Sequence, residues 1–313
     1  MFLRAIPDQG RVEPAWERMR LTVQIATKLN RSHLFNGRTA FDDYAQRRGS
    51  LEVFCAISGL ETALWDICGK ALGQPVYNLL GGPVRSGIRV YANGWYYQMT
   101  KPEDYARAAE KIVATGFTAI KMDPISGPWR THPTREQEMK SISVLKAVRD
   151  AVGPDVDILL DIHRRLAPMH AVRLAGEYEQ FRPYWMEEPC VGENLDALAE
   201  IRAGVSIPVV IGEAIYTKAG FRNVFAAGAA YIINPDVANC GGILELKEIA
   251  AMAEAHLVAV SPHNYNSTVL GLAATVQASA LMPNFIITEY FVPFVELGDK
   301  LSPNQLKPVN GVI

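Results

Sequence analysis

The sequence predicts an α/β protein whose larger part is a TIM-type (β/α)₈ barrel. From residue 88 onward, short runs of β-branched, aliphatic and aromatic residues alternate with longer stretches of helical periodicity. The short runs are nearly continuous in apolar residues, which is typical of parallel strands buried on both faces. Eight strand–helix units in succession favour a closed barrel over an open sheet. The segment "YANGWYYQ" after the first strand also lacks the glycine-rich phosphate loop of an open dinucleotide-binding sheet.

The strands and helices of this barrel can be placed along the chain. The eight predicted strands are residues 88–94, 119–124, 157–163, 184–189, 208–213, 231–236, 258–264 and 285–291. Seven amphipathic helical stretches lie between them, among them "PEDYARAAEKIVATG", which ends near Gly116. Each strand is thus followed by a helix that returns the chain to the start of the next parallel strand.

Residues 1–87 have a different pattern. Two long helices are predicted at residues 14–30 and 51–72, joined by the polar stretch "NGRTAFDDYAQRRGS", and no strand is predicted there. We therefore expect a mostly helical lead-in over residues 1–87, followed by the barrel over residues 88–313.

Composition argues against several classes of partner. The 313 residues carry a formal net charge of −2, which gives no electrostatic reason to expect a nucleic acid or an anionic membrane surface. No run of about 18 apolar residues is present to span a bilayer. The four cysteines are far apart, lack metal-site spacing, and favour reduced thiols. We expect a cytoplasmic protein that acts on a small molecule.

Polar residues stand at the ends of the predicted strands, where a barrel of this kind places its active site. They are Lys121, Asp123, Asp161, His163, Glu187, Glu213, Asp236, His263 and Glu289. Three of the carboxylates, those of Asp161, Glu187 and Glu213, end adjacent strands at intervals of 26 residues. Converging carboxylates repel one another unless a cation neutralises them, and oxygen ligands favour a hard ion. The pattern therefore predicts a Mg²⁺ site.

Two histidines flank this predicted metal site. His163 lies two residues after Asp161, on the same face of its strand, and His263 ends the seventh strand in "SPHN". Imidazole is suited to general acid–base work near neutral pH, so we expect both histidines to be catalytic. Asp236, at the end of the sixth strand, can hydrogen-bond the ring of His263 and fix its tautomer. Lys121 is expected to add positive charge beside a metal-bound anion.

Longer motifs from about residue 51 to the C-terminus resemble a known family. The segments "SGLETALWDICGKALGQPVYNLLGG", "GFTAIKMDP", "DIH", "WMEEP", "IGE", "INPDVANCGGI", "SPHN" and "ITEYF" are similar to the mandelate racemase subgroup of the enolase superfamily. Within that subgroup, the chain most resembles sugar-acid dehydratases of the galactonate dehydratase type. The resemblance implies a partial capping domain over residues 1–87, without its β-sheet, and a C-terminally shortened barrel over residues 88–313.

The resemblance also implies a reaction and a role for each strand-end residue. The implied Mg²⁺ ligands are Asp161, Glu187 and Glu213. His263, paired with Asp236, would remove the proton α to the substrate carboxylate, and His163 would protonate the departing 3-hydroxyl group. Glu289 would hydrogen-bond the carboxylate end of the resulting enediolate, and Lys121 would stabilise its charge. The implied enzyme is a hydro-lyase that converts an aldonate-type sugar acid into a 2-keto-3-deoxy acid.

Two departures from the family pattern define the alternatives. The racemases carry a KxK motif on the second strand, whereas this chain has Lys121-Met122-Asp123, which disfavours two-base racemisation and leaves dehydration untouched. The chain also starts among the capping helices and stops at "LKPVNGVI", so we expect a truncated product with slow or no turnover. Helix surfaces left without a cap sheet would promote a homo-oligomer. The alternatives are an epimerase, racemase or cycloisomerase of the same superfamily, or a non-catalytic barrel.

Overall fold

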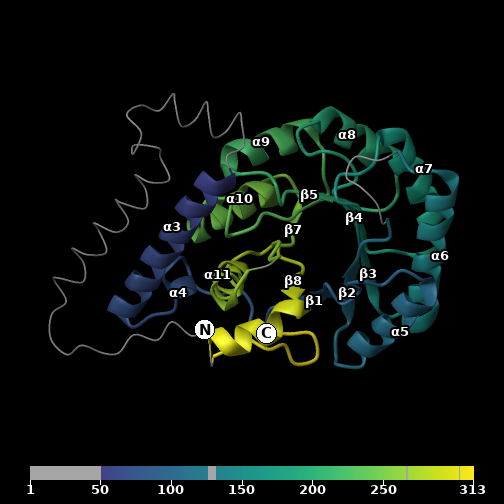
Figure 1. Cartoon of the computed structure of the whole chain (residues 1–313). Coiled ribbons are helices and arrows are strands. Elements are labelled where there is room, and N and C mark those ends of the chain that lie inside the picture. Colours follow the sequence, from purple (N-terminus) through teal and green to yellow (C-terminus); the bar gives the residue numbers. More distant parts are fainter. Residues whose placement is uncertain (1–50, 126–131, 266, 303) are drawn as a thin grey trace.

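Eight parallel strands form the centre of the computed structural model, which describes residues 51–125, 132–265, 267–302 and 304–313. The strands are β1 (Val90–Asn93), β2 (Ala119–Met122), β3 (Asp157–Asp161), β4 (Trp185–Glu187), β5 (Val209–Ile211), β6 (Ile232–Ile233), β7 (Ala259–Val260) and β8 (Thr288–Phe291). Their order is β7-β6-β5-β4-β3-β2-β1-β8. A parallel bridge between Val260 and Phe285 joins the two ends of this sheet, with the Val260 amide donating to the Asn284 carbonyl at 2.9 Å. The predicted barrel is confirmed (Figure 1).

Helices surround the ring of strands, as Figure 1 shows. Those that connect successive strands are α5 (Pro102–Val113), α6 (Arg135–Val152), α7 (Pro168–Tyr178), α8 (Leu195–Gly204), α9 (Thr217–Ala227), α10 (Ile243–Ala255) and α11 (Val269–Ser279). The remaining described elements are α3 (Leu51–Leu72), α4 (Val76–Leu79), the 3₁₀ helices η2 (Glu179–Phe181) and η3 (Val292–Phe294), and α12 (Val295–Leu301). One helix therefore follows each of the first seven strands, as the periodicity predicts.

The observed strands are shorter than the predicted ones, mostly at their C-terminal ends. The predicted strand 231–236 is reduced to two residues, and so is 258–264. Prolines explain most of this difference because they cannot donate to a sheet ladder. Pro124, Pro189, Pro235 and Pro262 follow β2, β4, β6 and β7 within two residues. The polar residues predicted at strand ends therefore lie partly on the strands and partly on the first residues of the loops.

Side chains inside the barrel form an apolar layer and then a polar layer. The apolar layer consists of Tyr91, Ala119, Leu159, Trp185, Val210, Ile232 and Ile287, all buried. Since alternate residues of a strand share a face, the residue two positions later points into the same interior. Those positions are Asn93, Lys121, Asp161, Glu187, Gly212, Asn234 and Glu289. The predicted site is thus the upper layer of the barrel interior, resting on an apolar floor.

Helix α3 is the longest described element of the N-terminal region and lies beside α10 (Figure 1). Its bounds, Leu51–Leu72, match the predicted helix at 51–72, and residues 51–87 contain no strand. The helix predicted at 14–30 lies outside the described residues, as does most of the predicted lead-in. Among the described helices, none combines the length and the apolarity needed to cross a membrane.

Candidate active site

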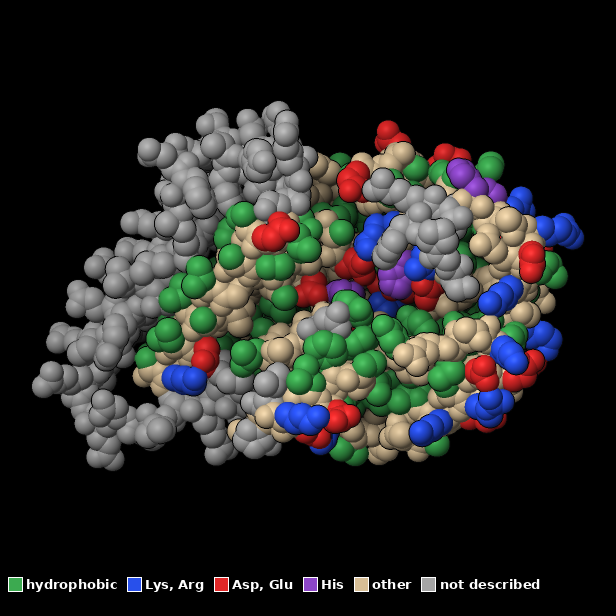
Figure 2. All heavy atoms as spheres, in the orientation of Figure 1, with side chains coloured by type: hydrophobic (Ala, Val, Ile, Leu, Met, Phe, Trp, Pro, Cys, Tyr) green, Lys and Arg blue, Asp and Glu red, His purple; other side chains and the backbone are tan. Residues whose placement is uncertain are grey.

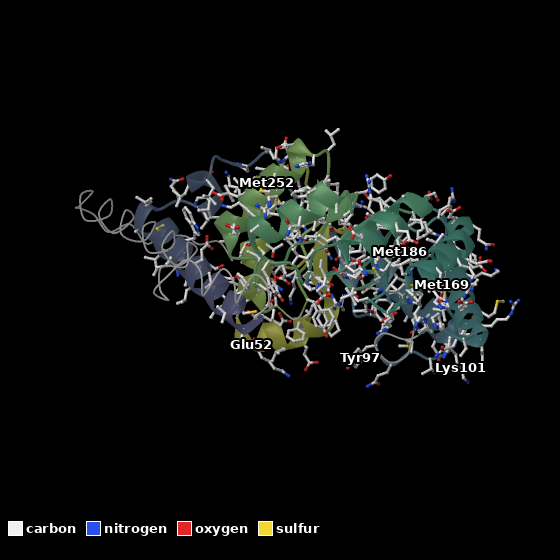
Figure 3. The ribbon with its side chains drawn as sticks, turned by 90° about the horizontal axis from the view of Figure 1, so that it is seen from above. Glu52, Tyr97, Lys101, Met169, Met186 and Met252 are labelled. Atoms are coloured by element: carbon white, nitrogen blue, oxygen red, sulfur yellow. The ribbon has the colours of Figure 1, made fainter. Side chains whose placement is uncertain are left out.

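The polar layer opens at one face of the barrel. Figure 2 shows acidic, basic and histidine side chains gathered in a hollow at the middle of this face. In Figure 3, Tyr97, which follows β1, and Glu52, in the first turn of α3, lie at one side of the molecule, and Met252 of α10 lies at the other. The C-terminal end of β1 and the start of α3 are therefore on the same side as the hollow.

Lys121 on β2 is fully buried and lies between three carboxylates. Its Nζ is 2.8 Å from Glu187 Oε1, 3.4 Å from Asp161 Oδ2 and 3.5 Å from Glu289 Oε1. Burial alone would lower the pKa of Lys121, but the charges of Glu187 and Glu289 outweigh it and raise this pKa well above its usual value. The lysine is thus a fixed positive charge at the centre of the polar layer.

The three predicted metal ligands converge, although not as one tight group. Asp161 and Glu187 are register partners on β3 and β4, so their side chains point the same way. Among the described residues, Glu187, Glu213 and His263 form a set whose potential ligand atoms all lie within 4.8 Å of one another. His263 thus takes the place in this set that the sequence assigns to Asp161. The third predicted ligand is nevertheless near, because Lys121 contacts both Asp161 and Glu187.

The carboxylates respond oppositely to their surroundings. Burial raises the pKa of Glu187, Lys121 lowers it, and the charges of Asp161 and Glu213 raise it again, to about 8. Burial also acts to raise the pKa of Asp161, but His163 and Lys121 outweigh it and lower this pKa to about 2. Lys121 has three buried carboxylates around it, those of Asp161, Glu187 and Glu289. Its single positive charge cannot balance all three.

His263 and Asp236 form the predicted pair. His263 Nδ1 is 2.7 Å from Asp236 Oδ2, and the two residues are also joined by a parallel backbone bridge. The other ring nitrogen, Nε2, faces the site, 3.2 Å from Glu213 Oε2 and 3.4 Å from Glu289 Oε2. Burial lowers the pKa of His263, but Glu289, Glu213 and Asp236 outweigh it and raise this pKa to about 10.

His163 forms a second pair of the same kind with Asp123. His163 Nδ1 is 3.0 Å from Asp123 Oδ2, and its Nε2 is 3.4 Å from Asp161 Oδ2. The guanidinium of Arg165 also donates to Asp123, which fixes this carboxylate. Burial lowers the pKa of His163, but Asp161 and Asp123 outweigh it and raise this pKa to about 9. The acid that stands where racemases have a second lysine is therefore the partner of His163.

Glu289 on β8 completes the predicted set. It is fully buried, and its Oε2 accepts a 2.9 Å hydrogen bond from the Asn264 amide. Its Oε1 accepts from the side chain of Asn93. Burial acts to raise the pKa of Glu289, but Lys121 and His263 outweigh it and lower this pKa. Every predicted site residue thus faces the polar layer or its rim.

Several residues of the site are absent from the predicted set. Asn93 and Asn234 occupy inward positions of β1 and of the loop after β6, and Asn234 Nδ2 donates to Glu187 Oε1 at 2.9 Å. Glu188 is fully buried and accepts from the Gly212 amide at 2.9 Å; its Oε2 has no hydrogen-bond partner among the described residues. The rule of alternate residues, applied to "YANG" and "INPD", would have found both asparagines. Glu188 carries no such signal.

Arg164 is also absent from the predicted set, and its backbone is unusual. His163 and Arg164 have φ angles of 51° and 62°, a region that costs a non-glycine residue about 1–3 kcal/mol. The turn places the Arg164 guanidinium 2.6 Å from Glu213 Oε1 and 3.6 Å from Glu188 Oε2. The described part of the site thus holds three permanently charged cations among its acids, namely Lys121, Arg164 and Arg165.

Two family models match the chain. Residues 104–313 match the enolase C-terminal domain-like family, and residues 24–81 match the N-terminal domain of mandelate racemase and muconate lactonizing enzyme. The chain belongs to the enolase superfamily. Its place in the mandelate racemase subgroup, predicted from the motifs, is confirmed by both matches.

Individual enolase-superfamily relatives extend the comparison. A D-gluconate dehydratase from Thermoproteus tenax is 34% identical over 306 residues, which are 94% of this chain and 61% of the relative. A D-galactarolactone cycloisomerase from Agrobacterium fabrum is also 34% identical, over 88% of this chain and 71% of the relative. The crystal structure of an enolase-superfamily member from Salmonella Typhimurium superposes with a TM-score of 0.84 at 30% identity, covering 94% of this chain and 78% of that one. This chain spans about three fifths of the length of the first relative.

The donor set of this enolase-superfamily site fits a hard divalent cation. Carboxylate oxygens of Glu187 and Glu213 lie close together, and the burial of Glu187 leaves its charge incompletely balanced. Members of the superfamily generally bind Mg²⁺, which prefers such oxygen ligands. All three predicted ligand carboxylates already accept hydrogen bonds or ion pairs from the protein, but each carboxylate oxygen has two lone pairs and can serve a donor and a metal together.

Proposed function

We propose that this chain catalyses the Mg²⁺-dependent dehydration of an aldonate-type sugar acid to a 2-keto-3-deoxy acid. The observation that carries this proposal is the presence of two His–Asp pairs, His263–Asp236 and His163–Asp123, around one cluster of carboxylates. The histidines follow β7 and β3, which lie four strands apart in a ring of eight and therefore on opposite sides of it. The D-gluconate dehydratase relative supports the substrate class.

One pair is assigned to the removal of the α-proton. A cation that offsets the acids around His263 would lower its raised pKa and free Nε2 of its proton. Asp236 then accepts the Nδ1 proton, and the Nε2 lone pair faces the polar layer. Nε2 then takes the proton from the carbon next to the substrate carboxylate. The electron pair of the C–H bond moves into the carboxylate and forms an enediolate, whose negative charge Lys121 stabilises from the barrel interior.

The other pair is assigned to the departure of water. Nε2 of His163 is the proposed proton donor, and Asp123 holds the ring through Nδ1. Nε2 donates its proton to the 3-hydroxyl group as the bond of that group to carbon breaks, so that water leaves. The resulting enol becomes a 2-keto acid by tautomerisation. Neither step changes the oxidation state of the protein.

Asp161, Glu187 and Glu213 are the residues proposed to hold Mg²⁺. When bound, the ion would neutralise carboxylates that raise the pKa of His263 and would stabilise the second negative charge on the substrate carboxylate. Glu289, anchored by Asn264 and Asn93, is proposed to orient the same end of the substrate.

A panel of aldonates, including D-gluconate, tests the proposal. Each would be incubated with the protein and Mg²⁺ in deuterated water, and assayed both for 2-keto acid and for deuterium at the α-carbon. Product formation that EDTA abolishes would support dehydration. Consumption of aldaro-lactones with no 2-keto acid from any aldonate would favour a cycloisomerase, and the absence of both reactions and of α-deuteration would contradict the proposal.

A further inference from the structure

A buried carboxylate joins α3 to the first turn of α10. Glu61 is 1% exposed, and its two oxygens accept backbone hydrogen bonds from Ile243 at 2.7 Å and Leu244 at 3.0 Å. The indole of Trp65, one turn further along α3, donates to Oε1 at 2.7 Å. An anion at a helix N-terminus satisfies amides that have no partner inside the helix. Here the capping residue comes from a part of the chain about 180 residues away.

The neighbouring residues are adapted to this contact. The hydroxyl of Ser58 accepts a 3.0 Å hydrogen bond from the Gly241 amide and donates to the Phe54 carbonyl. Gly242 has a φ of 96°, and a Cβ there would overlap the Glu61 carboxylate. Only glycine permits so close an approach. The segments "SGLET" and "NCGGI" are therefore the two halves of one joint.

A short loop, residues 236–242, connects this contact to Asp236, the partner of the proposed base His263. The carbonyl of Asp236 accepts hydrogen bonds from Asn239 at 3.1 Å and Cys240 at 2.8 Å, and its Oδ1 accepts from Ala238 at 2.8 Å. The remaining oxygen of Asp236 holds His263. The loop 236–242 is thus a compact turn fixed at one end by α3 and at the other by the ring of His263.

The same loop also supports a proposed metal ligand. The side chain of Asn239 donates to the Glu213 carbonyl at 3.0 Å, and the Thr217 amide donates to the Cys240 carbonyl at 3.1 Å. Displacement of the loop would therefore move the partner of His263 and the backbone of Glu213 together. The contact of Glu61 with the first turn of α10 is therefore connected, through this loop, to the site as well as to the helix.

We propose that Glu61 is a positioning residue for the Asp236–His263 pair, acting from helix α3 through the loop 236–242. The inference rests on the proposed function for its catalytic consequence, but its structural consequence can be measured separately. Helix α3 then sets the geometry of α-proton removal without touching the substrate.

The variant Glu61→Gln tests this proposal because it keeps the size of the side chain and turns one accepting oxygen into an NH₂ group that opposes an amide of α10. Thr134→Ala is the matched control, since Thr134 caps α6 through the Gln137 amide and has no described contact with the site. Both variants should lower the melting temperature. At a temperature where both are folded, we expect Glu61→Gln to slow α-proton exchange at least tenfold with little change in KM, and Thr134→Ala to leave the rate unchanged.

Amide hydrogen exchange provides a readout that needs no substrate. In Glu61→Gln, we expect faster exchange in segments 236–242 and 258–264, and in Thr134→Ala neither segment should change. Ser58→Ala, which removes the contact with Gly241 and the hydrogen bond to the Phe54 carbonyl within α3, should give the same pattern more weakly and serves if Glu61→Gln does not fold. Unchanged exchange in 258–264 in the folded variants, or equal α-proton exchange rates for Glu61→Gln and Thr134→Ala, would overturn the inference. A wild-type protein that exchanges no substrate proton would instead refute the proposed function, and the amide data would still decide the role of Glu61.

Discussion

The guanidinium of Arg164 lies 2.6 Å from one carboxylate oxygen of Glu213, while the ring of His263 lies 3.2 Å from the other. Both oxygens of a proposed Mg²⁺ ligand are therefore in contact with basic groups. Arg164 remains charged at any ordinary pH, so a metal ion that binds Glu213 must share it with this cation. The affinity of the site for metal is thus set in part by an arginine held in a strained turn.

Replacing Arg164 by glycine should tighten Mg²⁺ binding. The change removes a positive charge and a charged hydrogen bond worth about 1.5–3 kcal/mol, so the dissociation constant should fall by roughly tenfold to a hundredfold. Calorimetric titration of Mg²⁺ measures it. Leu257→Gly is the control for backbone strain, because Leu257 has a φ of 56° and lies on the surface, 95% exposed. Equal or weaker Mg²⁺ binding by Arg164→Gly would contradict the shared-ligand interpretation.

Glu213→Gln should weaken Mg²⁺ binding strongly in the same titration, since a neutral amide replaces a carboxylate ligand. We expect little or no heat of binding at concentrations that saturate the wild type. Asn194→Ala, which removes the cap of α8 at the Ala197 amide, is the control and should bind as the wild type does. The same heat and affinity in Glu213→Gln as in the wild type would remove Glu213 from the ligand set.

Lys121→Met should destabilise the metal-free protein severely. Three carboxylates would lose a buried partner, and breaking a buried ion pair costs about 3–5 kcal/mol. Urea unfolding with and without Mg²⁺ measures the effect, and the ion should recover part of the loss because it balances the same charges. Lys70→Met is the control: Lys70 pairs with Asp66 on the surface of α3, and its loss should cost less than about 1 kcal/mol. A similar small loss for both variants would show that the acids tolerate the absence of Lys121.

The two histidines should have separable roles. His263→Asn should abolish exchange of the substrate α-proton with deuterium, whereas His163→Asn should block elimination and can leave that exchange intact, since the acid acts after the enediolate forms. Mass spectrometry of recovered substrate and a 2-keto acid assay follow the two steps. His256→Asn, at the end of α10, should retain both. Elimination at the wild-type rate in His163→Asn would refute its assignment as the acid.

Glu61 should make the stability of the protein depend on pH. Burial raises the pKa of Glu61 from 4.5 to about 7, against the opposing hydrogen bonds from Leu244 and Ile243. An acid whose pKa is raised on folding stabilises the fold below its unfolded pKa, and this contribution is lost as the pH rises through the folded value. Between pH 4.5 and 7 it should decrease by on the order of 3 kcal/mol. Urea unfolding of wild type and Glu61→Gln at pH 5 and pH 8 tests this; a difference between the two proteins that is the same at both pH values would contradict it.

The barrel and most of its polar layer were predictable because they depend on local patterns. Apolar strands followed by helices indicate the fold, and alternation along a strand places Asp161, Glu187 and Glu289 inside it. Strand ends were less predictable, since Pro235 and Pro262 shorten β6 and β7 while the chain keeps its extended course. The pattern of apolar residues contains no information about where a ladder loses its hydrogen bonds.

Pairings between distant segments could not be predicted from spacing. The partnership of Asp123 with His163 depends on how the loops after β2 and β3 approach each other, and the side chain of Arg164 reaches Glu213 only because the backbone turns through a rare conformation. Glu61 and Ile243 illustrate the same difficulty over a longer range. Neither the sequence around Glu61 nor the sequence around Ile243 indicates a partner. The hydrogen bond between them forms only because α3 packs against α10.

The pairing of β1 with β8 has a consequence for folding during synthesis on the ribosome. Val90 pairs with Thr288, and the ladder continues to Asn93 and Phe291, so the first strand finds this neighbour only after almost two hundred further residues have been made. At about 5–20 residues per second, synthesis leaves that edge of the sheet uncovered for roughly 10–40 seconds. An unpaired strand edge is a template for association with other chains. Nascent chains of this protein should therefore depend on chaperones until their last strand emerges, and arrest of translation before residue 288 should cause them to aggregate.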